Sequence, residues 1–200
     1  MPPAPYDACD KRAGRVSSLS LVRYRGTDYS VPTRFGHGEV LIRGYVHEVV
    51  ISCGAEVIAR HPRSYEHEDF VFDPLHYLSL LEHKTKALDQ AAPLVGWVLP
   101  PVFVDLRRLL EVRMGKKGKR EYVQVLRLLE TFSLDDVGAA ISDALGRGVI
   151  GFDAVKHLVL CRIERRPPRL NLMAYPYLPC AEVATTSASS YMGLLTGGAS

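Results

Sequence analysis

The sequence of 200 residues lacks the features that mark membrane-spanning and secreted chains. It has no apolar run of the roughly 18–20 residues that a membrane helix needs, because the candidate stretch Leu94–Val104 is interrupted by a glycine and two prolines. The first residues, Met1–Pro5, have no basic segment followed by an apolar one, so a signal peptide is not predicted. We therefore expect a cytoplasmic protein without a membrane partner.

Cysteine is scarce, and its pattern predicts no metal site. The four cysteines are far apart and form no C-x-x-C pair: Cys9, Cys53, Cys161 and Cys180. Their spacing does not fit a zinc site, so free thiols are expected. His76 and His83 are seven residues apart, whereas zinc-binding helices place histidines four apart, and both are predicted to lie at the surface. No metal or other cofactor is expected.

No group of residues predicts a catalytic centre. Asp135, Asp136 and Asp143 are the most concentrated carboxylates, but two-metal catalysis needs acids that converge from separate elements. The first two follow Ser133 in the first turn of an expected helix, where acids act as caps. The segment Gly115–Lys119 is basic and glycine-rich without the spacing of a phosphate-binding loop. We therefore predict no catalytic residue.

Short alternating strands follow one another between residues 15 and 66. Five strands are expected there with no helix between them, and a sheet this small most simply protects its edges and buries one face as an SH3-like β-barrel. Much of the core is predicted to come from residues that recur at a spacing of two within strands. They are Leu19, Leu21, Val31, Val40, Ile42, Val49, Ile51 and Val57.

Helical patterns dominate the rest of the chain. Asp73 is expected to cap a helix, a second helix is expected over Asp105–Met114, and a basic loop, Gly115–Arg120, leads into three short helices that end near Arg165. The predicted fold class is α+β multidomain, a small five-stranded barrel followed by an α-helical region. The expected divisions are a flexible segment at 1–14, the barrel at 15–66, the helical region at 67–170 and a loose tail at 171–200.

Charge is distributed unevenly along the chain, whose net charge is +3. The stretch from Gly115 to Leu170 contains eleven basic and seven acidic residues, whereas the net charge of the stretch from His67 to Met114 is −2. A local basic excess favours a polyanionic partner, although solvated helix faces can have the same composition.

A series of motifs runs through the chain in a fixed order. They are Gly26–Pro32 (GTDYSVP), Val40–Arg43, Glu56–Arg63, Phe72–Tyr77, Lys119–Glu130 and Arg162–Pro168. The first three resemble the C-terminal β-barrel of Mu-type and integrase-like transposases. The whole series is similar to the C-terminal region of IstA-type insertion-sequence transposases, over roughly Cys9 to Leu195.

The resemblance implies a part in DNA transposition, with DNA and other transposase subunits as partners and association with the nucleoid. In that family an N-terminal helix-turn-helix region reads the element ends, and an RNase H-like domain with three carboxylates joins DNA strands by means of divalent metal. An IstB-type ATPase assists target selection. Only fourteen residues precede the expected barrel, so we expect the catalytic domain of this DDE-type family to be absent and the chain not to be an enzyme.

Candidate DNA contacts are basic residues that would meet backbone phosphates without reading bases. They are Arg23, Arg25, Arg34 and Arg43 beside Tyr24 and Tyr29 on the barrel, Lys116, Lys117, Lys119 and Arg120 in the basic loop, and Arg162, Arg165 and Arg166 after them. Each group also has a structural explanation without DNA. The barrel arginines suit a polar outer face, the basic loop suits a solvated turn, and the last arginines suit a helix C-terminus. Two further readings of the whole chain stay open: a module that recruits the ATPase partner, and an inactive truncated remnant.

Overall fold

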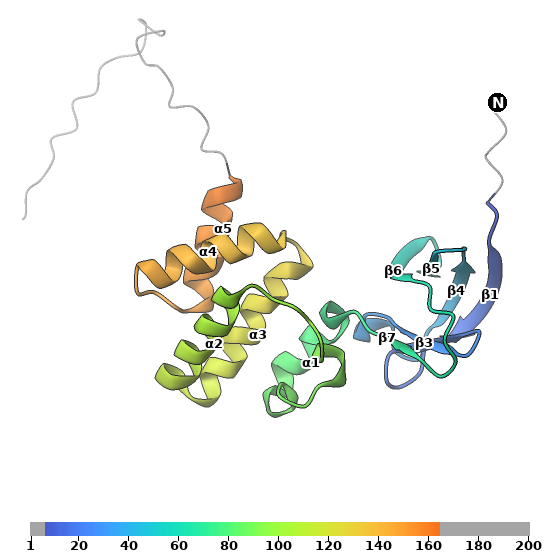
Figure 1. Ribbon diagram of the computed structural model, residues 1–200, viewed down its shortest axis with the longest axis horizontal. Helices are drawn as coiled ribbons and strands as arrows, with labels where there is room; N and C mark the ends of the chain where they lie inside the picture. Colours follow the sequence, from blue (N-terminus) through green and yellow to red (C-terminus); the bar gives the residue numbers. More distant parts are fainter. Residues whose placement is uncertain (1–6, 165–200) are drawn as a thin grey trace, which may run out of the picture. The chain divides into compact units, whose positions relative to one another are not determined.

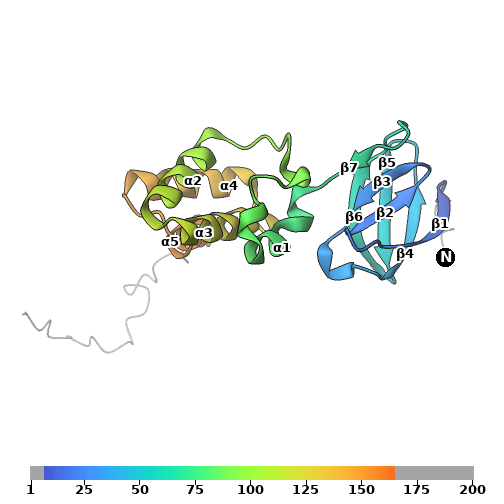
Figure 2. The same ribbon diagram turned by 90° about the horizontal axis from the view of Figure 1, so that it is seen from below.

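Strands dominate the first part of the computed structural model, which describes residues 7–164 (Figures 1 and 2). Within these residues they form two sheets, with the strand orders β1-β4-β5-β6 and β2-β3-β7. The strands are β1 (Asp10–Arg15), β2 (Leu21–Tyr24), β3 (Thr27–Ser30), β4 (Glu39–Gly44), β5 (Glu48–Cys53), β6 (Glu56–Pro62) and β7 (Phe70–Val71). We call residues 10–71 the β module.

The predicted α+β class is confirmed, because the β module is followed by helices. The single five-stranded barrel is not confirmed: the described residues contain seven strands in two sheets. The sheets nevertheless share one apolar core, in which Val22 and Tyr29 of one sheet meet Ile42 and Ile51 of the other.

Strand β1 lies in a stretch that the sequence assigned to a flexible segment. It pairs antiparallel with β4 along its whole length, from Asp10 opposite Gly44 to Arg15 opposite Glu39. Its side chains are exposed or half-buried, so backbone pairing holds it rather than burial. A strand without an apolar face has no hydrophobic alternation, which is why the sequence pattern did not reveal it.

Six of the eight predicted core residues are buried, and two are not. Leu19 is 69% exposed because β2 begins only at Leu21, after a turn in which Ser20 has a φ of 60°. Val57 is 40% exposed because the register of β5 and β6 shifts near Ile51 and Ser52. Ile58 is buried in its place. A bulge of this kind moves side chains to the opposite face, and simple alternation cannot predict it.

Helices follow the β module in what we call the helical region, residues 74–164. The α-helices are α1 (Leu78–His83), α2 (Pro101–Met114), α3 (Lys116–Arg127), α4 (Leu134–Gly146) and α5 (Phe152–Ile163). Short 3-10 turns are η1 (Thr33–Phe35) in the β module and η2 (Pro74–Tyr77), η3 (Thr85–Ala87), η4 (Ala92–Leu94) and η5 (Leu128–Glu130) between the helices. None of the helices in the described range is long and apolar enough to cross a membrane.

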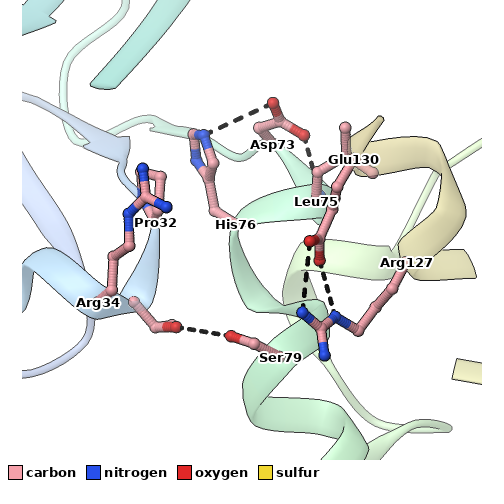
Figure 3. Close-up of a pocket in the computed structure, with 9 residues that line it drawn as sticks. Pro32, Arg34, Asp73, Leu75, His76, Ser79, Arg127 and Glu130 are labelled. Carbon is pink, nitrogen blue, oxygen red and sulfur yellow. Dashed lines mark hydrogen bonds and ion pairs between the residues drawn. The ribbon is translucent and has the colours of Figure 1, made fainter. Parts of the chain in front are cut away.

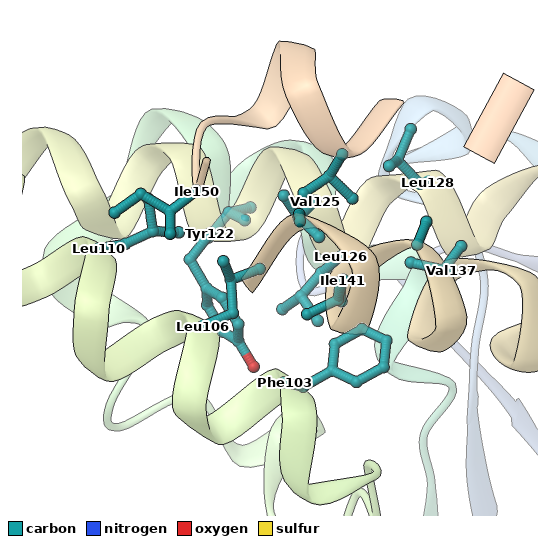
Figure 4. Packing of buried hydrophobic residues seen from close by; sticks show 14 of the residues in the cluster. Phe103, Leu106, Leu110, Tyr122, Val125, Leu126, Leu128, Val137, Ile141 and Ile150 are labelled. Atoms are coloured by element: carbon teal, nitrogen blue, oxygen red, sulfur yellow. The ribbon is translucent and has the colours of Figure 1, made fainter. Parts of the chain in front are cut away.

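The helical region has a core of its own, shown in Figure 4. Phe103, Leu106 and Leu110 of α2 are fully buried and pack with side chains of α3 and α4, among them Leu126 and Ile141. Helix α2 begins four residues earlier than predicted, at Pro101, where proline suits the first helical position.

The basic segment predicted as a loop, Gly115–Arg120, is helical from Lys116 onward. Gly115 has a φ of 56° and makes the sharp turn between α2 and α3. Gly118 then lets the two helices approach closely, since a Cβ there would overlap the carbonyl oxygen of Leu110. The glycines therefore serve a tight helix junction and not a flexible loop. The predicted tail at 171–200 lies outside the described residues.

Candidate nucleic-acid interface

Three arginines surround one buried tyrosine at an end of the β module. The guanidinium carbons of Arg12, Arg25 and Arg63 lie 5.9, 5.9 and 5.6 Å from the ring centroid of Tyr24. The ring is 2% exposed and packs against Gly44 of β4, where a Cβ would overlap it. Arginine is attracted to an aromatic ring at such distances, so Tyr24 holds three positive charges together.

A single carboxylate opposes these charges. One oxygen of Asp10, Oδ2, accepts hydrogen bonds from Arg25 Nη2 at 2.9 Å, Arg25 Nε at 3.2 Å, Arg12 Nε at 3.2 Å and the Tyr24 hydroxyl at 3.1 Å. These donors, Arg25 first, lower the pKa of the Asp10 carboxyl below its ordinary value. We call Asp10, Arg12, Tyr24, Arg25 and Arg63 the Tyr24 cluster; it carries a net charge of +2.

A second tyrosine lies beside this cluster. Arg63 also stands over the ring of Tyr65, 4.5 Å from its centroid, and Tyr65 is 68% exposed. The two arginines Arg12 and Arg25 line one open hollow of about 470 Å³ together with Arg63, Ser64, Tyr65 and His67. The hollow is therefore lined by basic side chains together with one exposed aromatic ring.

Hydrogen bonds fix the loop that carries Tyr65. The Tyr65 hydroxyl donates to the Val46 carbonyl at 2.8 Å, and the Ser64 amide donates to the Tyr29 hydroxyl at 3.0 Å. Arg63 donates from Nη1 to the Tyr45 carbonyl at 2.7 Å. Charged and aromatic groups are thus held in place before any ligand arrives.

The four arginines predicted on the β module do not form one face. Arg25 belongs to the Tyr24 cluster, and Arg23 lies on β2 with its charge 3.7 Å from Asp28. Arg34 is in η1, where it pairs with Glu56 at 3.0 Å. Arg43 is half-buried and donates to the Ser52 hydroxyl at 2.7 Å. The alternation of residues along a strand predicts which side chains are exposed, but it does not predict which partner each arginine contacts. The sequence therefore could not distinguish these four arginines.

The cations predicted in the helical region differ in how they are neutralised. Lys119 pairs with Asp89, and Arg120 lies 3.7 Å from Glu82. Lys116 and Lys117 are exposed at the start of α3, with no ion pair among the described residues. Arg162 of α5 pairs with Asp143 at 2.5 Å. Arg165 and Arg166 lie outside the described residues.

Another hollow, of about 400 Å³, is shown in Figure 3. Its lining carries charges of both signs: Arg34 and Arg127 are accompanied by Asp73 and Glu130. Arg127 is already bound to Glu130 at 3.0 Å and to Glu82 at 2.6 Å. These carboxylates neutralise the basic groups, so the hollow is poorly suited to a polyanion.

His76, which lines this hollow, was predicted to lie at the surface. This prediction is wrong, because its side chain is only 10% exposed and forms part of a buried junction. His76 Nδ1 lies 2.9 Å from the Ser30 hydroxyl, and its Nε2 lies 3.7 Å from Asp73. Burial lowers the pKa of His76 to about 4. The order Ser30, His76, Asp73 is reminiscent of a nucleophilic triad, but Ser30 is fully buried and its hydroxyl accepts the Asp73 amide proton at 2.8 Å. Its role is structural.

No group of three or more acidic, histidine or cysteine side chains in the described range could hold a metal ion. Ser133 caps α4, as predicted, by accepting the Asp136 amide proton at 3.1 Å, and it donates to the Asp136 carboxylate at 2.6 Å. Asp136 therefore takes part in the cap, and Asp135 lies in the same first turn.

The sequence predictions missed Arg12, Arg63 and Tyr65. Arg12 lies on the unforeseen strand β1, and the other two follow Pro62, where the expected strand ends. The useful signal was the alternation of arginine and tyrosine in Arg63-Ser64-Tyr65 and Tyr24-Arg25. Residues far apart in sequence meet here through strand pairing.

Sequence comparisons agree with the resemblance drawn from the motifs. Residues 1–73 match the family described as Mu transposase, C-terminal domain. The chain is 32% identical over 172 residues to a transposase for insertion sequences IS1326/IS1353 from Pseudomonas aeruginosa, which covers 84% of this chain and 33% of the relative. It is 31% identical over 150 residues to a transposase from Aminobacter aminovorans, with 72% and 29% covered. No solved structure matches.

The chain thus spans about a third of the length of the curated relatives that it matches. The family match covers the β module, and the similarity to the insertion-sequence transposases extends over most of the chain. The comparisons confirm the predicted resemblance, and this chain has the sequence of a transposase C-terminal region.

Proposed function

We propose that this chain is a non-catalytic C-terminal part of a DDE-type transposase that binds the DNA backbone and helps to assemble transposase subunits on DNA. The observation that carries the proposal is the Tyr24 cluster. Three guanidinium groups lie around one tyrosine there, two of them share the carboxylate of Asp10, and arginine forms charge-assisted, bidentate bonds with phosphate.

The contact is proposed to be sequence-tolerant. Phosphate contacts position a protein on DNA without reading bases, and none of the cluster residues belongs to a helix that could enter the major groove. Lys116 and Lys117 would add a weaker, mobile contribution, since lysine meets phosphate as a point charge on a flexible stem.

Salt dependence of DNA binding tests this proposal. Fluorescence anisotropy with a short duplex should show affinity that falls between about 50 and 200 mM salt, with a slope of about −0.9 per phosphate contact on a log–log plot. Changing the base sequence should leave the affinity almost unchanged. Binding that ignores salt would contradict a backbone contact.

The non-catalytic part of the proposal has its own test. With Mg²⁺ or Mn²⁺ present, the purified chain should neither cleave nor join a DNA fragment that carries element ends. Metal-dependent cleavage that Asp135→Ala or Asp136→Ala abolishes would refute it. Since the Ser133–Asp136 pair caps α4, the folded state of these variants must be verified first.

A second candidate function is recruitment of an IstB-type ATPase. It is favoured by an apolar hollow of about 480 Å³ in which Leu19, Phe70 and Leu80 are 69%, 52% and 42% exposed. Contiguous exposed apolar surface is typical of protein-binding sites. On this alternative Leu19→Ser and Phe70→Ser abolish ATPase binding while DNA affinity and its salt slope stay unchanged. If the isolated chain binds neither DNA nor the ATPase, an inactive remnant is favoured.

A further inference from the structure

The hollow beside Tyr24 has the two chemical ends of a nucleotide. Arg12 and Arg25 supply a basic end, and the exposed ring of Tyr65 supplies an aromatic end. Arg63 links them, because it lies 5.6 Å from the Tyr24 centroid and 4.5 Å from the Tyr65 centroid. A volume of about 470 Å³ lies in the range of small-ligand sites, roughly 300–1,000 Å³.

We propose that the Tyr24 cluster and Tyr65 form a site for one unpaired nucleotide of DNA, whose phosphate takes the place of the Asp10 carboxylate on Arg12 and Arg25 while its base stacks on Tyr65. This proposal rests on the proposed function, since it assumes that the chain binds DNA. It goes beyond it by specifying which DNA structure the site prefers.

The basic end already holds an anionic oxygen. Asp10 Oδ2 is the acceptor for Nε and Nη2 of Arg25, for Nε of Arg12 and for the Tyr24 hydroxyl. A DNA phosphodiester carries one negative charge, as a carboxylate does, and presents two unesterified oxygens that suit bidentate arginine, so the same donors can bind it. Asp10 has a side chain that is one-third exposed, at 33%, and solvent reaches it. It acts in the free protein as a counter-ion that a phosphate can displace.

The aromatic end is both exposed and held in place. The Tyr65 hydroxyl is tied to the Val46 carbonyl at 2.8 Å, and Arg63 stands over the ring. With 68% of the residue exposed, ring surface remains free for a stacking partner. A ring that is fixed before binding loses little conformational freedom when a base stacks on it.

Stacking on Tyr65 requires a base with a free face. In a paired duplex each base is covered by its neighbours, whereas an unpaired base can be turned outward and stacked on an aromatic side chain. Glu66 and Glu68 follow Tyr65 in the same loop and are exposed, so their negative charges disfavour a second phosphate near this loop. The site therefore fits one nucleotide better than a continuous duplex.

Binding of two duplexes by the full chain tests the proposal. One duplex is fully paired, and the other has the same sequence with a single unpaired adenine. We expect the wild-type chain to prefer the second by about tenfold, because stacking of one base is worth about that factor or more. Tyr65→Ala should abolish the preference, so that both duplexes bind with the same affinity, whereas Tyr65→Phe keeps the stacking ring and should retain the preference.

Asp10→Asn provides an independent readout. Removing the competing carboxylate should raise affinity for both duplexes severalfold, whereas a purely structural ion pair would predict equal or weaker binding. Free deoxyadenosine monophosphate has the phosphate and the base that the site takes but cannot reach the additional backbone contacts of Lys116 and Lys117, so it should compete more weakly than the unpaired duplex. Competition by it as strong as that by the unpaired duplex would overturn the assignment to DNA.

Failure of the nucleotide site and failure of the proposed function would give different results. Salt-dependent binding of the paired duplex without any preference for the unpaired base, or a preference that survives Tyr65→Ala, refutes the nucleotide site and leaves the proposed function intact. Absence of binding to both duplexes refutes both. Tyr65 is exposed, so its variants should keep the thermal unfolding midpoint of the wild type, which is the control for folding.

Discussion

The β module and the helical region both gather basic residues, but their charges are balanced differently. In the helical region Arg107 and Lys119 share Asp89, and Arg107 also pairs with Glu111, so two cations meet two carboxylates. Arg120 and Arg127 are balanced in the same way by Glu82 and Glu130. In the Tyr24 cluster Arg12 and Arg25 share one carboxylate, Asp10, while Arg63 contacts the Tyr24 ring and has no ion pair among the described residues.

The difference shows that a basic excess in the sequence does not locate a binding site. The segment from Gly115 to Leu170 has an excess of +4 in the sequence, but four of its cations, Lys119, Arg120, Arg127 and Arg162, are ion-paired within the fold. The pKa of Glu82 is lowered by Arg127 above all, and that of Asp89 by Lys119, which is the signature of these internal pairs. In the β module an aromatic ring instead brings Arg12, Arg25 and Arg63 together beside one carboxylate.

The largest expected effect is a loss of stability when the core of the helical region is altered. Phe103→Ala removes a fully buried ring from the helical core and should lower the free energy of unfolding by about 3–5 kcal/mol. Val104→Ala, next to it on α2 but 62% exposed, should change it by about 0.5 kcal/mol or less. Urea unfolding followed by circular dichroism measures both. Equal effects would contradict the described core.

A glycine substitution tests the packing that supports the cluster. A Cβ at Gly44 would overlap the Tyr24 ring, so Gly44→Ala should destabilise the chain by about 1–3 kcal/mol and weaken DNA binding by moving the arginines. Gly36→Ala in the same module meets its nearest atom, the Thr33 carbonyl oxygen, at 3.4 Å and should be nearly neutral. Retention of full stability and DNA affinity in Gly44→Ala would show that Tyr24 is not held as described.

Acid should weaken the junction between β3 and η2. Burial lowers the pKa of His76 from 6.5 to about 4 and also lowers that of His61, and the two rings lie 5.6 Å apart with Asp73 nearby. The unfolded chain therefore binds more protons than the folded chain in this window, so stability is complete above about pH 6.5 and falls as the pH drops toward 4.

Thermal unfolding midpoints measured from pH 7 to pH 4.5 test this dependence. His76→Gln should flatten the profile, while His83→Gln, on the exposed end of α1, should leave it unchanged. A profile that is unaffected by His76→Gln would place the acid sensitivity elsewhere.

The smallest expected effect concerns the lysines at the start of α3. Lys116→Gln with Lys117→Gln should reduce the slope of DNA affinity against salt by at most about 1.8, since two phosphate contacts are lost. The matched control, Lys84→Gln with Lys86→Gln, lies in the stretch that sums to −2 and should change the slope less. An equal change of the salt slope in both double variants would mean that DNA binding depends on the net charge of the chain and not on the position of these lysines.

Much of the fold could be predicted from hydrophobic spacing, and the parts that could not have physical reasons. The alternation of Val40 and Ile42, and of Val49 and Ile51, identified buried strand faces correctly. Strand β1 has no apolar face, and the irregularity near Ser52 reverses the alternation of β6, so neither could be read from period alone.

The candidate site was harder to predict than the fold. Arg25 and Tyr24 were recognised as a basic and aromatic pair, but Arg12 and Arg63 reach them only through the pairing of β1 with β4 and through the turn after β6. The Gly115–Arg120 segment was misjudged as a loop because glycine also marks close helix contacts, as Gly118 does against Leu110. Long-range pairing carries this information, and a single sequence does not display it.

The most direct test of the central claim compares two triple variants that remove the same net charge. Arg12, Arg25 and Arg63 are changed to Gln in one, and Lys119, Arg120 and Arg162, which are all ion-paired, in the other. Duplex DNA affinity is then measured against salt. We expect the first variant to lose about 2–3 from the log–log slope and the second to keep the slope of the wild type. Equal loss in both variants, or a greater loss in the second, would contradict the claim that the β module carries the main DNA contact.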